Sequence, residues 1–278
     1  MGKSTDRNRR LLSAARQGYR QVACMLLESG ADVMARGDRG ETALHAAAGD
    51  GQAEMIEYLV PLIGEIDVRD ESGATPLDWA ARGNRIDAVQ LLLALGADPQ
   101  ATDHEGRTAL HVADRSGAST SEQTEPREES RVAQTLIDAG ANVNASDRLG
   151  STPLHAAVRD GHLSLAKVLI GAGAKVDART TSRETPLHLA SERSYKDLVK
   201  SLLQAGAAVN RVDLVGRTPL HRHLGAPHRG KEIIDLLLNG GADVNAVDKQ
   251  GRTILDEATR RNPRDPIGDL LRRQGAVG

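Results

Sequence analysis

The chain has 278 residues and a formal net charge of −2, with no phenylalanine, one tryptophan and a single cysteine. Near-neutrality gives no overall attraction to nucleic acid or to an anionic membrane surface, so neither partner is expected. A single cysteine cannot form a disulfide within the chain, and the sequence has no stretch of about 18 consecutive apolar residues. We therefore expect a soluble, cytoplasmic monomer that does not cross a membrane.

A four-residue motif, Thr-Pro-Leu-His or a near variant, recurs along the chain. Its leucines are spaced by 33 residues, apart from one step of 44: Leu44, Leu77, Leu110, Leu154, Leu187 and Leu220. The motif threonine is placed to cap a helix, and proline suits the first helical turn. A leucine-rich run and then a Gly-Ala pair follow most copies, which indicates a second helix that ends at glycine.

This pattern resembles the ankyrin repeat, whose unit is a turn and two antiparallel helices. Leu11 lies 33 residues before Leu44, and Leu255 belongs to a degenerate last copy. The resemblance implies an all-α ankyrin-repeat solenoid of about eight helix-turn-helix repeats with β-hairpin fingers. We expect a single domain over 1–278: a tail at 1–6, capping repeats at 7–36 and 248–278, and six internal repeats at 37–247.

Three repeats depart from the pattern. Pro61 falls late in a second helix, so that helix is expected to end early or to bend. About eleven extra residues at 118–128 have the composition of a solvated loop between two helices. The finger at 180–183 lacks the usual glycine, which predicts a different turn there.

In five of the eight repeats, arginine lies five residues after the motif leucine, near the end of the first helix. In ankyrin repeats this position faces the concave surface, where many members bind partners, so these arginines would suit a partner with an acidic surface. The alternative is that they stabilise helix C-termini and are neutralised by neighbouring aspartates. The arginines at this position are Arg16, Arg82, Arg115, Arg159 and Arg260, with Arg193 one place later in its repeat.

Two further features are candidates for contact with a partner. Trp79 is the only tryptophan and serves either as an interface anchor or as packing against adjacent repeats. The finger tips vary in sequence, and Leu214-Val215 is an apolar tip that should be exposed unless something covers it. Other candidate tip residues are His104, Arg148 and Leu149.

The sequence favours no catalytic, metal or cofactor site. Five of the nine histidines are the motif histidine, which in this family orders the turns by hydrogen bonding, and His223 and His228 lack further ligands at suitable spacing. We therefore expect a non-catalytic module that binds another protein, as an adaptor, scaffold or inhibitor. Two alternatives remain: an enzyme or enzyme accessory that uses residues 118–128 as a lid, and a purely structural stack.

Overall fold

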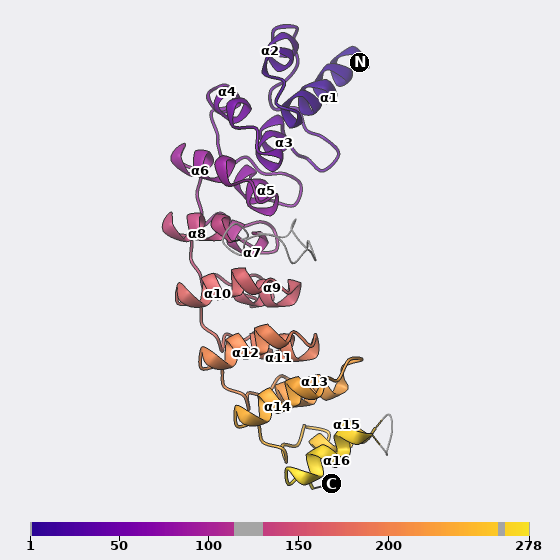
Figure 1. The fold of residues 1–278 in the computed structure, drawn as a ribbon. Helices are drawn as coiled ribbons and strands as arrows, with labels where there is room; N and C mark the ends of the chain where they lie inside the picture. The colour runs from indigo at the N-terminus through magenta and orange to yellow at the C-terminus, as the bar shows by residue number, and fades with distance from the viewer. Residues whose placement is uncertain (1, 114–129, 261–264, 278) are drawn as a thin grey trace. The chain divides into compact units, whose positions relative to one another are not determined.

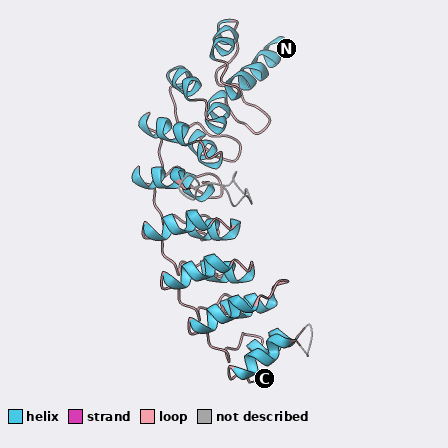
Figure 2. Cartoon of the chain, in the orientation of Figure 1, coloured by secondary structure: helices cyan, strands magenta, loops and turns pink. Residues whose placement is uncertain are grey.

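The computed structural model describes residues 2–113, 130–260 and 265–277, and every regular element in them is an α-helix (Figure 2). The fingers in these residues are turns rather than paired strands, with one isolated β-bridge between Val247 and Thr253. The all-α prediction is confirmed. The helices are α1 (Gly2–Arg16), α2 (Arg20–Glu28), α3 (Ala43–Asp50), α4 (Ala53–Ile63), α5 (Pro76–Arg82), α6 (Ile86–Ala94), α7 (Ala109–Val112), α8 (Arg131–Asp138), α9 (Pro153–Asp160), α10 (Leu163–Gly171), α11 (Pro186–Glu192), α12 (Lys196–Gln204), α13 (Pro219–Gly225), α14 (Lys231–Asn239), α15 (Ile254–Thr259) and α16 (Pro266–Arg273).

Contacts divide the chain into two compact units, 1–148 and 149–278, which we call the N-terminal and C-terminal units. Each unit is a stack of helix pairs (Figure 1). In the N-terminal unit, α3 packs on α5 and α5 on α7, while α4 packs on α6 and α6 on α8. In the C-terminal unit, α9, α11, α13 and α15 form one such row and α10, α12 and α14 another. Within each unit, helices thus pack on their partner in the same repeat and on a counterpart in the next repeat.

The motif residues explain why each first helix begins where it does. Thr42 has extended backbone angles before α3, its side chain pairs with the N3 backbone, and the His45 side chain accepts from the Thr42 N–H. The same capping box begins α5, α7, α9, α11, α13 and α15. It satisfies helix N–H groups that would otherwise lack partners. The motif leucines that follow, such as Leu44 and Leu154, are completely buried.

The fingers are stabilised by their own aspartates. The Asp213 Oδ1 accepts from the N–H groups of Val215 and Arg217, both at 2.9 Å. Asp70 and Asp248 accept in the same way in their fingers. A side-chain acceptor that satisfies two backbone donors fixes a tight turn without a strand ladder.

Two expectations about helix ends differ from the structure. Residues 2–6, expected as part of a tail, form the first turns of α1. The prediction that Pro61 ends its helix early is wrong, because α4 continues to Ile63 and stops at Gly64, which has φ +74°. Pro61 lies in the last turn, where its missing N–H removes only one helical hydrogen bond. The insertion expected at 118–128 lies outside the described residues.

The finger at 180–183 keeps the ordinary turn, so that prediction is also wrong. Arg183 takes φ +62°, where the neighbouring fingers have Gly150 at +70° and Gly216 at +84°. Its N–H donates to the Thr180 carbonyl at 2.8 Å, and the Thr180 N–H donates to the Glu184 carbonyl at 3.0 Å. A residue with a Cβ at such an angle costs about 1–2 kcal/mol.

We therefore predict that Arg183→Gly raises the free energy of unfolding of the full chain by about 1 kcal/mol, because glycine adopts a positive φ without strain. Urea denaturation followed by circular dichroism measures the effect. Arg193→Gly is a control, since Arg193 has φ −84° and glycine relieves no strain there. A destabilised Arg183→Gly chain would contradict the strain argument.

Candidate partner-binding surfaces

Three motif histidines, His45, His155 and His188, link their repeat to the next finger. The Nδ1 atom of His45 accepts from the Thr42 N–H at 3.2 Å, so its Nε2 carries the proton and donates to the Ala74 carbonyl at 3.0 Å. His155 and His188 make the same link, to the carbonyls of Glu184 and Arg217. Burial lowers the pKa of His188 to about 4, and burial also lowers the pKa of His45. These neutral histidines are structural, and the described residues hold no group of three or more side chains suited to a metal ion.

Asp78 replaces the motif histidine at the start of α5. Its Oδ2 accepts from the Thr75 N–H at 2.8 Å, so the cap is preserved. An ionised carboxylate has no proton to donate to the next finger, unlike histidine. Burial raises the pKa of Asp78 to about 7, against the opposing effect of its hydrogen bonds from Thr75. Asp78 is thus a cap residue whose ionisation is costly.

Trp79 is half-buried and is held by its own chain. Its Nε1 donates to the Asp70 Oδ2 at 2.9 Å, and its ring lies edge-on to His45 with centroids 5.7 Å apart. The Arg39 guanidinium lies 6.0 Å from the ring centroid. Gly49 makes room for the indole, since a Cβ there would lie 3.1 Å from Trp79 Cε3. The indole therefore joins two repeats and leaves only part of its surface to solvent.

In the C-terminal unit, Arg222 occupies the position that Trp79 has in its repeat. Arg222 follows Asp213 by nine residues, and Trp79 follows Asp70 by nine. The Arg222 Nε donates to Asp213 at 2.8 Å, and its Nη2 pairs with Glu184 at 2.6 Å. The sequence analysis missed this network. The signal that could have found it is the nine-residue spacing from a finger aspartate to a side chain able to donate.

The arginines near the ends of the first helices have different surroundings. Arg82 is exposed at the end of α5, and Arg193 is exposed after α11. Arg159 is half-buried and donates to the Ser151 Oγ at 3.0 Å. Arg16 pairs with Glu41 and Asp50, at 3.7 and 3.6 Å. Arg115 lies outside the described residues. Neighbouring carboxylates thus neutralise Arg16, as the alternative reading of these arginines expected.

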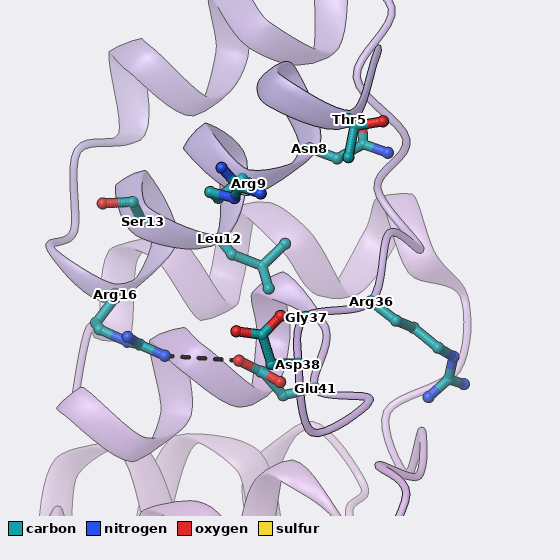
Figure 3. Close-up of a pocket in the computed structure, with 10 residues that line it drawn as sticks. All are labelled: Thr5, Asn8, Arg9, Leu12, Ser13, Arg16, Arg36, Gly37, Asp38 and Glu41. Carbon is teal, nitrogen blue, oxygen red and sulfur yellow. Dashed lines mark ion pairs between the residues drawn. The ribbon is translucent and has the colours of Figure 1, made fainter. Parts of the chain in front are cut away.

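A cleft of about 370 Å³ opens between α1 and the first finger (Figure 3). The Arg16–Glu41 ion pair crosses it, and Leu12 points from α1 toward the finger. Among its described lining residues there is no His, Cys or Lys to activate a nucleophile. The lining residues are Thr5, Asn8, Arg9, Leu12, Ser13, Arg16, Arg36, Gly37, Asp38 and Glu41.

The finger tips differ in chemistry between the two units. Exposed tip residues of the N-terminal unit are polar or charged and include Glu71, His104, Glu105 and Arg148. In the C-terminal unit, Leu149, Leu214 and Val215 are exposed to 61%, 52% and 39%. All the tip residues singled out from the sequence are therefore accessible to a partner.

Two more exposed apolar side chains, Val212 and Val247, were missed by the sequence analysis. They occupy the finger position at which arginine elsewhere bridges to the following finger: Arg36 donates to the Arg69 carbonyl at 2.6 Å, and Arg179 to the Val212 carbonyl at 2.8 Å. Valine cannot make this bond. An alignment of the finger sequences shows that valine replaces arginine at this position. Only the structure shows that the arginine donates to the carbonyl of the following finger.

The sequence matches the family model described as Ankyrin repeats (3 copies) over residues 11–103, 125–213 and 195–276. No curated protein matches it. Among the helices that the structure describes, none has the length and apolar character needed to span a membrane.

Two solved structures are similar over most of the chain. The human ASB11 ankyrin repeat domain is 25% identical, with a TM-score of 0.70, over 86% of this chain and all of that one. The ankyrin repeat domain of Bcl-3, a member of the IkappaB protein family, is 30% identical, with a TM-score of 0.67, over 84% of this chain and all of that one.

Asp78 generates a prediction about pH. In the unfolded chain its carboxyl ionises near 3.8, and in the fold near 7. Its contribution to stability is therefore complete below about pH 4 and is lost as the pH rises to about 7. That loss is at most about 4 kcal/mol. Buried His188 acts in the opposite direction, because its pKa of about 4 adds stability as the pH rises through about 4 to 6.5, and the lowered pKa of His45 acts in the same sense as that of His188.

Asp78→Asn removes only the carboxyl contribution, so we expect the variant to gain stability relative to the wild type as the pH rises from 4 to 7. Urea denaturation at several pH values measures this difference. Asp38→Asn, at an exposed tip, is the control. Parallel stability curves for wild type and Asp78→Asn would show that Asp78 does not titrate in this range.

Proposed function

Because this chain belongs to the ankyrin repeat family, we propose that it acts without catalysis, by binding another protein as an adaptor, scaffold or inhibitor. Ankyrin repeats are generally protein–protein interaction modules. A stack of such repeats presents side chains on a frame that is already ordered before binding. Binding to an ordered frame avoids part of the entropy cost of association.

The observation that carries this proposal is the exposed, variable chemistry of the finger tips on a constant frame. Leu214 and Val215 sit at a tip with both side chains accessible, where the N-terminal unit has polar pairs such as Glu71 and Ser72. Exposed apolar residues that lie together mark interaction sites more often than single ones do. A stack without a partner has no need of such a tip.

We propose two sets of contacts for the partner. One is formed by the tips, including His104, Arg148, Leu149, Leu214 and Val215. The other is formed by arginines near the ends of the first helices, chiefly Arg82 and Arg193, which are both exposed. Arginine binds carboxylates through two parallel hydrogen bonds, so a partner with an acidic surface fits both sets. We further propose that the chain is a cytoplasmic monomer.

Affinity capture from a lysate of the source organism, with mass spectrometry, tests the proposal. The baits are the full-length wild type, Arg82→Glu, Arg193→Glu and the double variant Leu214→Ser/Val215→Ser. We expect one protein to be retained by the wild type and reduced at least about tenfold by one or more variants, which corresponds to about 1.4 kcal/mol or more.

Arg273→Glu is the matched control, because Arg273 is an exposed arginine at the end of α16 outside both proposed contact sets. Specific retention that no surface variant lowers would contradict the proposed contacts. The absence of any specifically retained protein would contradict the proposed function itself.

A further inference from the structure

The finger tips of the C-terminal unit are joined into one row by backbone hydrogen bonds. The Thr181 N–H donates to the Leu149 carbonyl at 2.8 Å, the Leu214 N–H to the Ser182 carbonyl at 2.8 Å, and the Lys249 N–H to the Val215 carbonyl at 3.0 Å. We call this surface the finger row; it consists of Leu149, Thr181–Arg183, Leu214–Val215 and Lys249. Because each tip is bonded to the next, the positions of its side chains are fixed along the row.

The exposed side chains of the finger row are apolar, cationic or, at Thr181 and Ser182, uncharged and polar. Leu149, Leu214 and Val215 are exposed, and so are Arg183 and Lys249, which form no ion pair with any residue that the structure describes. The row itself contains no carboxylate. It therefore combines accessible apolar surface with positive charge.

Three carboxylates of these fingers are already engaged below the row. Asp213 and Asp248 are buried and are held by finger N–H groups and by arginines. Glu184 is half-buried and pairs with Arg222 at 2.6 Å. A carboxylate whose acceptor atoms are occupied cannot easily turn outward, so the positive charge of the row stays available.

Arg183 supplies an independent observation. It has φ +62° at the turn position that the other C-terminal fingers give to glycine: Gly150, Gly216 and Gly251, at φ +70°, +84° and +76°. Backbone strain of this kind is retained mainly where the side chain has a function. Among the described residues, none forms a hydrogen bond or an ion pair with the Arg183 guanidinium, so no contact within this part of the chain explains the strain.

We propose that the finger row docks an extended protein segment in which carboxylates alternate with aliphatic side chains, and that Arg183 is its central charged anchor. This inference rests on the proposed function and names the chemistry of the partner. Arg183 would hold a carboxylate through two parallel hydrogen bonds, while Leu149, Leu214 and Val215 cover apolar side chains. Fingers about 10 Å apart make a row of roughly 30 Å, which about ten extended residues span.

The chemistry of the row favours a protein segment over nucleic acid or lipid. Binding to single-stranded nucleic acid normally combines a basic groove with aromatic side chains on which bases stack, and the row has none. Recognition of anionic lipid relies on clusters of about four to eight basic residues, whereas the row has two. Three exposed aliphatic side chains beside two cations instead match an acidic, apolar peptide.

The test is selection from a phage-displayed library of random 12-residue peptides on the immobilised full chain, followed by fluorescence anisotropy of the selected peptides. We expect enriched peptides to contain Asp or Glu together with Leu, Ile or Val. Arg183→Gly should weaken their affinity at least about tenfold while it raises the stability of the chain. Leu214→Ser/Val215→Ser should weaken it similarly.

Asn84→Gly is the matched control, because Asn84 has φ +53° in the N-terminal unit, away from the finger row. It relieves a positive φ without touching the row, so peptide affinity should not change. Loss of binding in a chain that has become more stable cannot come from damage to the fold.

Three results would overturn the inference: no enrichment, enrichment of peptides without carboxylates, or affinities unchanged by Arg183→Gly. The inference would also be overturned if a 12-nucleotide single-stranded DNA or phosphatidylserine vesicles bound more tightly than the peptides and lost affinity in Arg183→Gly. That result would identify phosphate as the ligand. If these outcomes occur while lysate capture still yields a protein sensitive to Arg82→Glu or Arg193→Glu, the docking inference fails and the proposed function stands.

Discussion

The hydrogen bonds that a buried motif histidine makes to its own cap and to the carbonyl of the next finger are the interactions on which the repeats of His45, His155 and His188 depend. The histidine Nδ1 accepts from the N–H of the capping threonine. The Nε2 donates to a backbone carbonyl 29 residues later in the chain, from His45 to Ala74 and from His188 to Arg217. One neutral ring therefore begins a helix and positions the next turn. Because the ring is buried, water does not compete for either bond. Fingers held in this way leave their outward side chains free to vary.

That freedom explains how one repeat pattern carries two different surfaces. The earlier tips combine acidic and basic residues, such as Arg39 and Glu71, whereas Leu149, Leu214 and Val215 are exposed at later tips. Packing of the motif leucines is the same beneath both. In a repeat stack, stability is approximately the sum of the repeats and their interfaces, so exposed tips change with little effect on the whole. The residues that stabilise the stack are thus largely different from the residues proposed to bind a partner.

The frame was predictable from the sequence because cap, buried leucine and closing glycine recur at fixed intervals, and each has one physical role. The local exceptions were not. Arg183 keeps a turn that its sequence argues against, since bonds from Thr181 and Leu214 hold its finger from both sides. Pro61 is tolerated because it falls in the last turn of α4. The indole bond to Asp70 was missed although both residues lie in one repeat, because the repeat motif alone does not show which side chain donates to a finger aspartate.

The proposed docking surface requires a finger row that is rigid before any partner binds. Amide hydrogen exchange of the full chain, resolved to single residues by nuclear magnetic resonance, tests this. A rigid row predicts that the amides of Thr181, Leu214 and Lys249, which donate between fingers, exchange far more slowly than the same amides in an unstructured peptide. Exchange of all three at the rate of an unstructured peptide would show that the fingers move independently and would contradict a preorganised docking surface.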